Sequence, residues 1–449
     1  MASEWQEAPL GEMFDLINGY AFKSKEFTSS GIPVIKIKNV KAGYFSEQDF
    51  SYVSPDFLYS RSNKIAQRGD LLISMSGNRQ NGSPETWVGK VAHFKKGGLY
   101  LINQRVGALR ARKEYDVSPQ FMAYVLSSWD FQNLFISIAT SSGGQANISP
   151  TQILRTPVPV PPIQEQRAIA DILGTLDDKI ELNRQINRTL EAMARAIFKA
   201  WFVDFEPVKA KAAGSTSFRG MPQSVFDQLP DRFTDTELGP VPEGWEVKPI
   251  SSMASISRES VTPADSPDER FEHFSIPAFD AGMRPAQDLG GSIRSNKYVV
   301  SPYCVLVSKL NPRFARVWLP DDPEKSGRQI CSTEFLVVTP KEGWSREHLY
   351  CQFVEAGFRQ DLQRRASGTS NSHQRIKPKD FEKTVVVSPP ARVREAFSES
   401  VGPLFAKKAN GHKESQTLAA VRDTLLPQLI SGELRVEPSE PSATEAACR

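Results

Sequence analysis

One stretch of the chain, residues 161–207, constrains the fold more than any other. After Pro161 and Pro162 it continues for about forty residues with a single glycine and no proline before Pro207. Positions along it recur at alternating spacings of four and three residues, the pattern of a coiled-coil seam. The seam positions are Ile169, Leu173, Leu176, Ile180, Asn183, Asn187, Leu190, Ala194, Ile197 and Trp201. A helix of this length extends roughly 55 Å, so the pattern predicts a spacer that needs a partner helix.

Two amides interrupt the otherwise apolar seam. Asn183 and Asn187 would be buried between paired helices, which costs stability but fixes register and partner choice. The alternative interpretation is an ordinary long amphipathic helix that packs on one domain. A partner elsewhere in the chain would decide between them.

The chain supplies that partner, because the stretch is repeated. A shift of 228 residues superposes TSSGGQANISPTQILRTPVPVPP on the last 23 residues of RASGTSNSHQRIKPKDFEKTVVVSPP. The matched pairs are Ile148 with Ile376, Pro150 with Pro378, Thr156 with Thr384, and Pro161-Pro162 with Pro389-Pro390. Upstream, NQRVGALRARK resembles STEFLVVTPKE with a one-residue shift. A whole unit, domain plus helix, is therefore predicted to occur twice.

The second seam is less regular than the first. Its positions are Phe397, Val401, Leu404, Lys408, Gly411, Ser415, Leu418, Arg422, Leu425 and Leu429. Pro403 and Gly411 predict a kink or an interruption. The polar positions lie opposite Asn183 and Asn187 if the helices pair antiparallel, which favours pairing of the two helices with each other.

These observations predict an α+β fold. Two mixed α/β domains are each followed by a long helix, and the helices pair as an antiparallel coiled coil with pseudo-two-fold symmetry. The predicted boundaries are a first domain over 1–160, its helix over 161–207, a Pro-, Gly- and Ser-rich linker over 208–240, a second domain over 241–389, its helix over 390–434, and a disordered tail over 435–449. In the first domain, strands are predicted over 33–38, 70–75, 87–94 and 100–110, and a helix over 118–138.

Composition sets broad limits on function. The net charge of +3 is only mildly basic, although residues 1–162 hold 17 Lys and Arg against 13 Asp and Glu. No apolar run approaches membrane-spanning length, and the N-terminus has acidic residues where a signal peptide has lysine, so we expect a cytoplasmic protein that does not enter membranes. The cysteines predict neither a disulfide framework nor a zinc site. They are Cys304, Cys331, Cys351 and Cys448.

Enzymatic motifs fail at the positions that their chemistry needs. Gly239 to Gly244 is followed by Trp245, where a phosphate-binding loop requires lysine. The segments Val160-Pro161-Pro162-Ile163 and Ser388-Pro389-Pro390-Ala391 lack the Asp or Asn that an amino-methyltransferase places before its prolines, and they occupy matching places before each long helix. Pro230-Asp231 with Glu246-Val247-Lys248 matches a nuclease pattern formally, but Asp231 lies in the proline-rich linker. We therefore predict no catalytic or metal-binding residues.

Basic and amide side chains in predicted loops are the candidates for DNA contact. Such side chains bind base edges and phosphates. They are Lys36, Lys38 and Lys41 near a strand end, Arg79 in GNRQNG, and Asn311, Arg313 and Arg316 in NPRFARVW. The alternative is that each is an ordinary solvated surface charge.

Three segments together carry a family resemblance. EQRAIADILGTLDDKIELNRQINRTLEAMARAIFKAWFVDF resembles the central conserved region of the specificity (S) subunits of type I restriction-modification systems, and RGDLLIS resembles a recurrent strand of their target-recognition domains. The run TELGPVPEGWEVKPI and the duplicated architecture fit the same family, so the resemblance extends from Trp5 to about Val436.

The resemblance implies a non-catalytic, sequence-specific DNA-binding subunit. Each domain would read one half of a bipartite, asymmetric site in double-stranded DNA. The helices would hold two methyltransferase (M) subunits that use S-adenosylmethionine, and restriction (R) subunits would use ATP and Mg. The alternatives are a coiled-coil scaffold that does not read DNA and a self-contained DNA modification enzyme. The exposed seam of a fragment ending near Pro207 predicts that this fragment recruits a second copy of itself.

Overall fold

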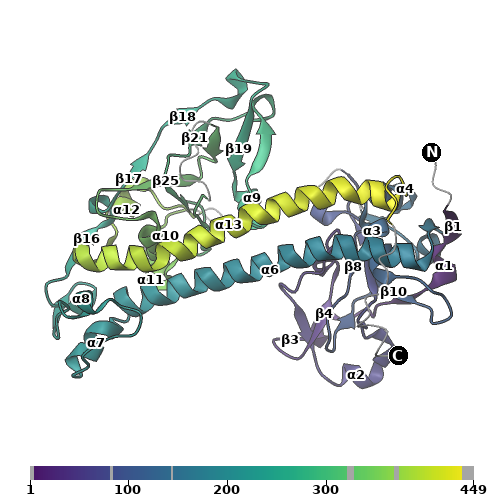
Figure 1. Cartoon of the computed structure of the whole chain (residues 1–449), viewed down its shortest axis with the longest axis horizontal. Helices are drawn as coiled ribbons and strands as arrows, with labels where there is room; N and C mark the ends of the chain where they lie inside the picture. Colours follow the sequence, from purple (N-terminus) through teal and green to yellow (C-terminus); the bar gives the residue numbers. More distant parts are fainter. Residues whose placement is uncertain (1–4, 81–83, 143–144, 321–327, 369–373, 437–449) are drawn as a thin grey trace. The chain divides into compact units, whose positions relative to one another are not determined.

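The structure is a computed structural model that describes residues 5–80, 84–142, 145–320, 328–368 and 374–436. It divides into two compact units: unit 1 comprises Met1–Glu181 and Gln416–Arg449, and unit 2 comprises Leu182–Ser415. Two long helices, α6 (Ile163–Phe202) and α13 (Ala391–Ile430), each contribute one part to each unit (Figure 1). Most of the predicted disordered tail, residues 437–449, and Gly143 and Gly144 of the first repeat segment lie outside the described residues.

Unit 1 is built on an antiparallel sheet in the order β2-β10-β6-β8. Its strands are β2 (Phe14–Asn18), β10 (Val106–Ala111), β6 (Leu71–Ser74) and β8 (Val91–His93). A second sheet, ordered β3-β5-β4-β9, comprises β3 (Phe27–Thr28), β5 (Ser51–Val53), β4 (Ile32–Ile35) and β9 (Leu101–Ile102). Smaller sheets join β11 (Thr140–Ser142), β12 (Gln145–Asn147) and β7 (Ser76–Gly77), and β1 (Gln6–Pro9) with β13 (Pro157–Val160).

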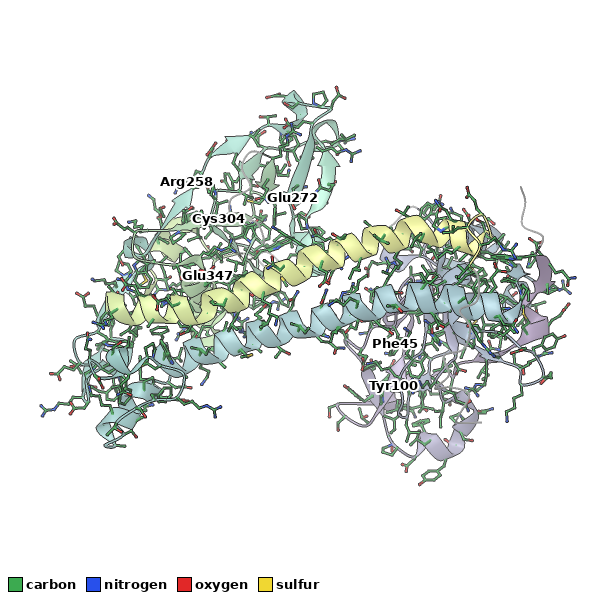
Figure 2. All side chains as sticks on the ribbon, in the orientation of Figure 1. Phe45, Tyr100, Arg258, Glu272, Cys304 and Glu347 are labelled. Carbon is green, nitrogen blue, oxygen red and sulfur yellow. The ribbon has the colours of Figure 1, made fainter. Side chains whose placement is uncertain are left out.

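Short helices cover these sheets of unit 1. The α-helices are α1 (Leu10–Met13), α2 (Phe57–Ser60), α3 (Pro119–Ser127), α4 (Trp129–Ile138) and α5 (Pro150–Leu154). The 3-10 turns are η1 (Ser24–Glu26), η2 (Ile37–Asn39), η3 (Ser62–Lys64) and η4 (Pro84–Thr86). Phe45 and Tyr100, labelled in Figure 2, have ring centroids 6.2 Å apart and flank the core of buried residues around Phe94.

Unit 2 contains a sheet that corresponds to the first sheet of unit 1, and its strand order is β17-β25-β22-β23. These strands are β17 (Ala254–Ser257), β25 (Phe335–Pro340), β22 (Val305–Ser308) and β23 (Val317–Trp318). Its second sheet is ordered β18-β21-β24-β19-β20 and comprises β18 (Ser260–Val261), β21 (Lys297–Val299), β24 (Gln329–Cys331), β19 (Arg270–Phe274) and β20 (Ala286–Leu289). Two strand pairs join β14 (Phe233–Thr236) with β15 (Gly239–Pro242), and β16 (Glu246–Pro249) with β26 (Val385–Ser388).

The short helices of unit 2 also follow the order of unit 1, with additions. They are α7 (Glu206–Ala212), α8 (Gln223–Phe226), α9 (Ile276–Asp280), α10 (Arg346–Val354), α11 (Ala356–Arg365) and α12 (Pro378–Glu382). The 3-10 turns are η5 (Ile250–Ser252), η6 (Pro263–Asp265) and η7 (Gly290–Ser292). The predicted fold class, with two mixed domains each followed by a long helix, is confirmed. The pseudo-two-fold relation concerns the placement of the units and stays a prediction.

A matched threonine shows how closely the repeat is kept beside the long helices. Thr156 and Thr384 are both buried, and each hydroxyl donates to the carbonyl four residues earlier. The backbone carbonyls of Thr156 and Thr384 themselves accept hydrogen bonds from the backbone N–H groups of Leu10 and Ile250, which lie in the first part of each domain. The repeat seen in the sequence is therefore a repeat of tertiary contacts.

The cores explain why the long helices belong to both units. In unit 1, Ile169 and Leu173 of α6 and Leu429 of α13 are part of one buried cluster with the domain helices. In unit 2, Phe198 of α6 and Phe397 of α13 join a second cluster. Burial of large apolar side chains is the dominant stabilising contribution, so each helix end is fixed to its domain core.

Several local predictions need correction. The helix predicted over 118–138 is two helices, α3 and α4, because Ser128 is extended and its side chain caps the second helix. The strand predicted over 100–110 is divided into β9 and β10, which belong to different sheets. The strands predicted over 33–38, 70–75 and 87–94 are present but shorter, as β4, β6 and β8.

The predicted interruption of the second helix is wrong, because α13 is helical from Ala391 to Ile430. Pro403 is exposed, as is Glu399, the residue whose carbonyl a proline at position 403 cannot bond. Gly411 has a packing role, since a Cβ atom there would lie 2.7 Å from Oδ1 of Asn187.

The segment 208–240 is not an open connection, contrary to its description as a linker. It holds α7, α8 and β14, and its residues Val208, Val225 and Phe226 are buried in the core of unit 2. Lys211 stabilises the segment by donating to the carbonyls of Phe226, Asp227 and Leu229. The domain boundaries themselves stay a prediction.

Candidate nucleic-acid interface and the helices that support it

The first group of predicted contact residues follows strand β4 in unit 1. Lys36 is partly buried: its ammonium donates to Oγ of Ser51 at 2.8 Å and lies 3.9 Å from the ring centroid of Phe27. Burial, with a smaller contribution from Lys38, lowers the pKa of Lys36. Lys38 itself is exposed. Of these two lysines, Lys38 has the more exposed side chain.

Lys41 and Arg79 are both engaged inside unit 1. Lys41 forms an ion pair with Glu85, and Arg79 donates to the carbonyl of Ala139. Close by, Lys90 donates to the carbonyl of Glu85, and burial lowers its pKa to about 8. These contacts hold the loop residues in place, and a phosphate would have to compete with them.

The second group lies in one loop of unit 2 between β22 and β23. Asn311 has a positive φ of 49°, an uncommon conformation that asparagine tolerates. Arg313 is exposed and stacks over Phe314 with 4.7 Å to the ring centroid. Arg316 forms a bidentate ion pair with Asp280, with both distances 2.8 Å. The loop therefore presents one exposed cation on an exposed aromatic ring.

Sequence reasoning missed the exposed aromatic side chains beside these loops. Phe314 is 47% exposed in its loop, and in unit 1 Trp129 is 62% exposed and packs against Trp87. Aromatic rings next to cations can stack on bases or ribose. The sequence shows the residue types, but it carries no signal that separates these rings from core aromatics.

The predicted seam of α6 and α13 is largely buried. Buried members are Ile169, Leu173, Ile180, Asn183, Asn187, Leu190 and Val401. Partly buried members are Leu176, Ile197, Leu404, Leu418 and Leu425.

Within each unit, contacts join rising residue numbers on α6 to falling residue numbers on α13, so the two helices pair antiparallel, as predicted. These contacts join Glu165 to Arg435 just beyond the end of α13, Asp177 to Arg422, Asn183 to Glu414, and Glu191 to Lys408.

In unit 1 a tyrosine links the domain to this helix pair. Oη of Tyr124 in α3 donates to Asp177 of α6 at 2.7 Å, and the same carboxylate pairs with Arg422 of α13 at 2.7 Å. Burial and the neighbouring Asp177 raise the pKa of Tyr124. One carboxylate thus joins three helices.

Unit 2 contains the same arrangement with different residues. Tyr350 of α10 donates to Glu191 of α6 at 2.8 Å, and Lys408 of α13 donates to the other carboxylate oxygen at 2.6 Å. Burial alone would raise the pKa of Glu191, but Lys408 and Tyr350 together hold it below its usual value. The carboxylate is therefore charged at neutral pH.

The polar centres of the two seams meet, as the antiparallel pairing requires. Nδ2 of Asn183 donates to Glu414 at 2.8 Å. Asn187 packs against Gly411, and among the described residues its side-chain amide has no hydrogen-bond partner. Gly411 provides the space that this amide occupies.

The Pro-Pro segments stand where each long helix begins. Pro161 and Pro162 immediately precede α6, and Gln166 fixes this start by donating to the carbonyl of Pro161 while accepting from the backbone of Ser118. Pro389 and Pro390 immediately precede α13. This is the helix-start role that their matching positions indicated.

The remaining candidate chemistry does not assemble. Lys248 pairs with Glu246 within β16, and Asp231 is exposed beside Arg232. Across the described ranges, no three His, Cys, Asp or Glu side chains are grouped closely enough to hold a metal ion, and no helix has the length and apolarity to cross a membrane. Cys304, Cys331 and Cys351 are buried free thiols, and Cys448 lies outside the described residues.

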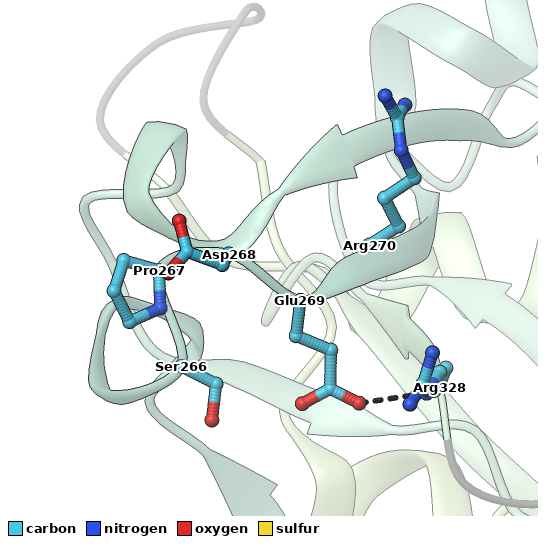
Figure 3. A pocket seen from close by; sticks show the side chains of 6 residues that line it. All are labelled: Ser266, Pro267, Asp268, Glu269, Arg270 and Arg328. Carbon is cyan, nitrogen blue, oxygen red and sulfur yellow. Dashed lines mark ion pairs between the residues drawn. The ribbon is translucent and has the colours of Figure 1, made fainter.

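Unit 2 also has an open hollow of about 610 Å³ at the start of β19 (Figure 3). Its lining residues are Ser266, Pro267, Asp268, Glu269, Arg270 and Arg328. Glu269 and Arg328 neutralise each other at 2.8 Å. The lining of the hollow combines Pro267 with acidic and basic side chains.

Two repeated domains with basic and aromatic loops, mounted on one pair of long helices, define a two-module recognition protein. The chain belongs to the family of specificity (S) subunits of type I restriction-modification systems, and it is the non-catalytic component of such an enzyme. Residues 2–192 match the family model described as the type I restriction modification DNA specificity domain.

Relatives and a solved structure agree over nearly the full length. The HindI specificity subunit of Haemophilus influenzae is 27% identical, over 96% of this chain and 100% of that protein. The EcoKI specificity subunit of Escherichia coli strain K12 is 24% identical, over 96% of this chain and 90% of that protein. The crystal structure of an S subunit from M. genitalium covers 95% of this chain and 96% of its own, with a TM-score of 0.54 and 13% identity, and supports the fold.

Proposed function

We propose that each unit reads one half of a bipartite, asymmetric site in duplex DNA and that the α6–α13 pair sets the gap between the half-sites. The observation that carries the proposal is a repeated framework with divergent loops. The first sheets have the same order in both units, whereas the candidate loops differ in residues and surroundings. Two different readers on equivalent supports give two different half-sites.

Within each unit, the exposed cations are the proposed phosphate or base contacts. Lys38 in unit 1 and Arg313 in unit 2 are exposed, and Arg313 is held over Phe314. Lys36, Lys41, Arg79 and Arg316 have internal partners, so we assign them to loop positioning. Asn311, whose backbone is held by Gln374, stays a candidate for base contact.

The chain is a component of a type I restriction-modification complex, and we propose which partners the helices bind. Ile172, Leu182 and Met193 of α6 are between 38% and 49% exposed, as is Val421 of α13 at 42%. Apolar side chains that gather on an exposed surface suit protein partners. We assign them to two methyltransferase subunits, which carry S-adenosylmethionine. Restriction subunits carry ATP and Mg, and the complex acts on DNA in the cytoplasm.

The proposal is tested by selecting bound sequences from a random duplex library with the purified S–M complex. We expect an enriched motif of two specified half-sites separated by an unspecified gap. Arg313→Ala should weaken the selection at one half-site only, and Lys38→Ala at the other, with exposed Lys23→Ala as the control. The chain without M should bind duplex DNA weakly, with affinity that falls steeply as salt rises.

The competing function is a scaffold that assembles partners without reading sequence. It predicts no enriched motif and equal binding to all duplexes, although the S–M complex still forms. Enrichment of one continuous motif, or of a motif that is unchanged by both substitutions, would also contradict the assignment of one half-site to each unit.

A further inference from the structure

Among the described residues, one ion pair in each unit joins α6 to α13, and these two ion pairs share an orientation that the internal repeat does not require. In both units α6 supplies the acid, Asp177 or Glu191, and α13 supplies the base, Arg422 or Lys408. If the contacts followed the symmetry of the repeat, the acid would lie on α6 in one unit and on α13 in the other. The charges therefore distinguish α6 from α13.

We infer that the charged residues and the Asn187–Gly411 contact make α6 select α13 of its own chain and reject pairing with α6 of a second copy. The 228-residue repeat shows what such a like-with-like pair would contain. It replaces Lys408 by Ile180 and Arg422 by Ala194.

In that like-with-like pair, Glu191 would face isoleucine and Asp177 would face alanine. The Glu191 side chain is 20% exposed and that of Asp177 26% exposed, so both carboxylates would lose their cations in a largely desolvated place. Leaving one partner of a buried ion pair uncompensated is strongly unfavourable. By symmetry each loss would occur twice.

The polar centre adds a steric obstacle to the same pairing. The repeat places Asn183 of a second copy at the position of Gly411. A Cβ atom at Gly411 would already lie 2.7 Å from Oδ1 and 3.2 Å from Nδ2 of Asn187. An asparagine there cannot be accommodated without moving Asn187. This contradicts the expectation that the exposed seam of α6 alone recruits a second copy.

The direct test transplants the α6 residues onto α13 in the full chain, as Lys408→Ile, Gly411→Asn and Arg422→Ala combined. This variant places the like-with-like contacts inside one molecule. We expect its melting temperature to fall by many degrees. The matched control, Val401→Leu with Leu425→Ile, transplants the uncharged α6 residues and should change the melting temperature little. A triple variant as stable as the control would overturn the inference.

Charge-reversal variants distinguish a loss of selective pairing between α6 and α13 from a non-specific loss of stability. One full-length chain carries Asp177→Arg and Glu191→Lys, and a second carries Lys408→Glu and Arg422→Asp. Each alone should melt early, and combining all four changes in one chain should restore the melting temperature and the monomer. Co-expression of the two chains should yield a heterodimer in native mass spectrometry. Failure of the four-fold variant to recover, or absence of the heterodimer, would contradict the inference.

Discussion

The two units agree in their first sheets and differ in their second. β2-β10-β6-β8 and β17-β25-β22-β23 have the same order and the same antiparallel pairing. The second sheet has four strands in unit 1 and five in unit 2, although both retain one parallel pair, β4 with β9 and β19 with β24. Tertiary contacts beside the long helices are thus kept, while the second sheet is free to vary.

A single matched position shows how this difference reaches the core. Ser118 and Ser345 cap α3 and α10, and three residues later stand Phe121 and His348, both buried. His348 is surrounded by aromatic rings, with centroids 4.9 Å away for both Phe202 and Trp344. Burial, with a smaller contribution from Arg394, lowers its pKa to about 3. Unit 2 therefore has an acid-sensitive group where unit 1 has a phenyl ring.

The largest effect that we expect concerns this histidine. The unfolded chain binds a proton near pH 6.5, whereas folded His348 does not until about pH 3, so stability is lost as pH falls through this window. Well inside this pH window, each unit by which the pH falls lowers the unfolding free energy by about 1.4 kcal/mol. His348→Phe should flatten the dependence of the unfolding free energy of unit 2 between pH 6.5 and 5, measured by urea denaturation.

His93 of unit 1 provides the internal reference for that measurement. Burial also lowers its pKa, to about 4, so unit 1 should retain its own pH dependence in the His348→Phe variant. An unchanged pH profile for unit 2 would show that His348 is protonated or solvated in the folded protein.

The next effect concerns the glycine of α13 that packs against α6. Gly411→Ala should destabilise the protein by up to about 2 kcal/mol, because overpacking against Asn187 costs about 1–3 kcal/mol and helix propensity returns about 1 kcal/mol. Adding Asn187→Ala should recover the stability in thermal unfolding. Additive losses in the double variant would show that the two residues do not share one space.

The smallest effect compares matched positions on the two helices. Beyond its chain neighbours and the backbone of its own helix, a Cβ atom added at Gly402 would meet no atom within 4 Å, whereas one added at Gly174 would lie 2.2 Å from Nε2 of Gln120. Gly402→Ala should stabilise the protein in thermal unfolding by up to about 1 kcal/mol, reduced by the crowding of the new Cβ against the ring of Pro403. Gly174→Ala should gain little, because Gln120 must give up its hydrogen bond to Ala170. Equal gains at both positions would contradict the contact with Gln120.

Sequence reasoning succeeded where short-range periodicity determines structure. The four-three spacing indicated both helices, and the repeat indicated their antiparallel pairing. It did not predict that α13 continues through Pro403, because an unpaired backbone group costs less on the exposed side of a helix than in a core. It also could not show that Lys41 and Arg316 are engaged, since their partners Glu85 and Asp280 lie 44 and 36 residues away in the chain.

If the α6–α13 pair sets the distance between the two DNA-reading units, lengthening this pair should widen the gap between the half-sites. A methylation map tests this. Four residues are added to both helices, repeating 182–185 in α6 and 410–413 in α13, so that both ion pairs stay matched and the coil accommodates a stutter. Each insert adds about 6 Å, roughly two base pairs of DNA. An insert in α6 alone is the control, and circular dichroism checks helicity.

DNA from cells that carry the S variant with its M subunits is sequenced for methylated adenine. We expect both half-sites to keep their bases while the gap between them grows by one or two base pairs. A helical double insert that changes the bases recognised and leaves the gap unaltered would contradict the claim that α6 and α13 set the spacing.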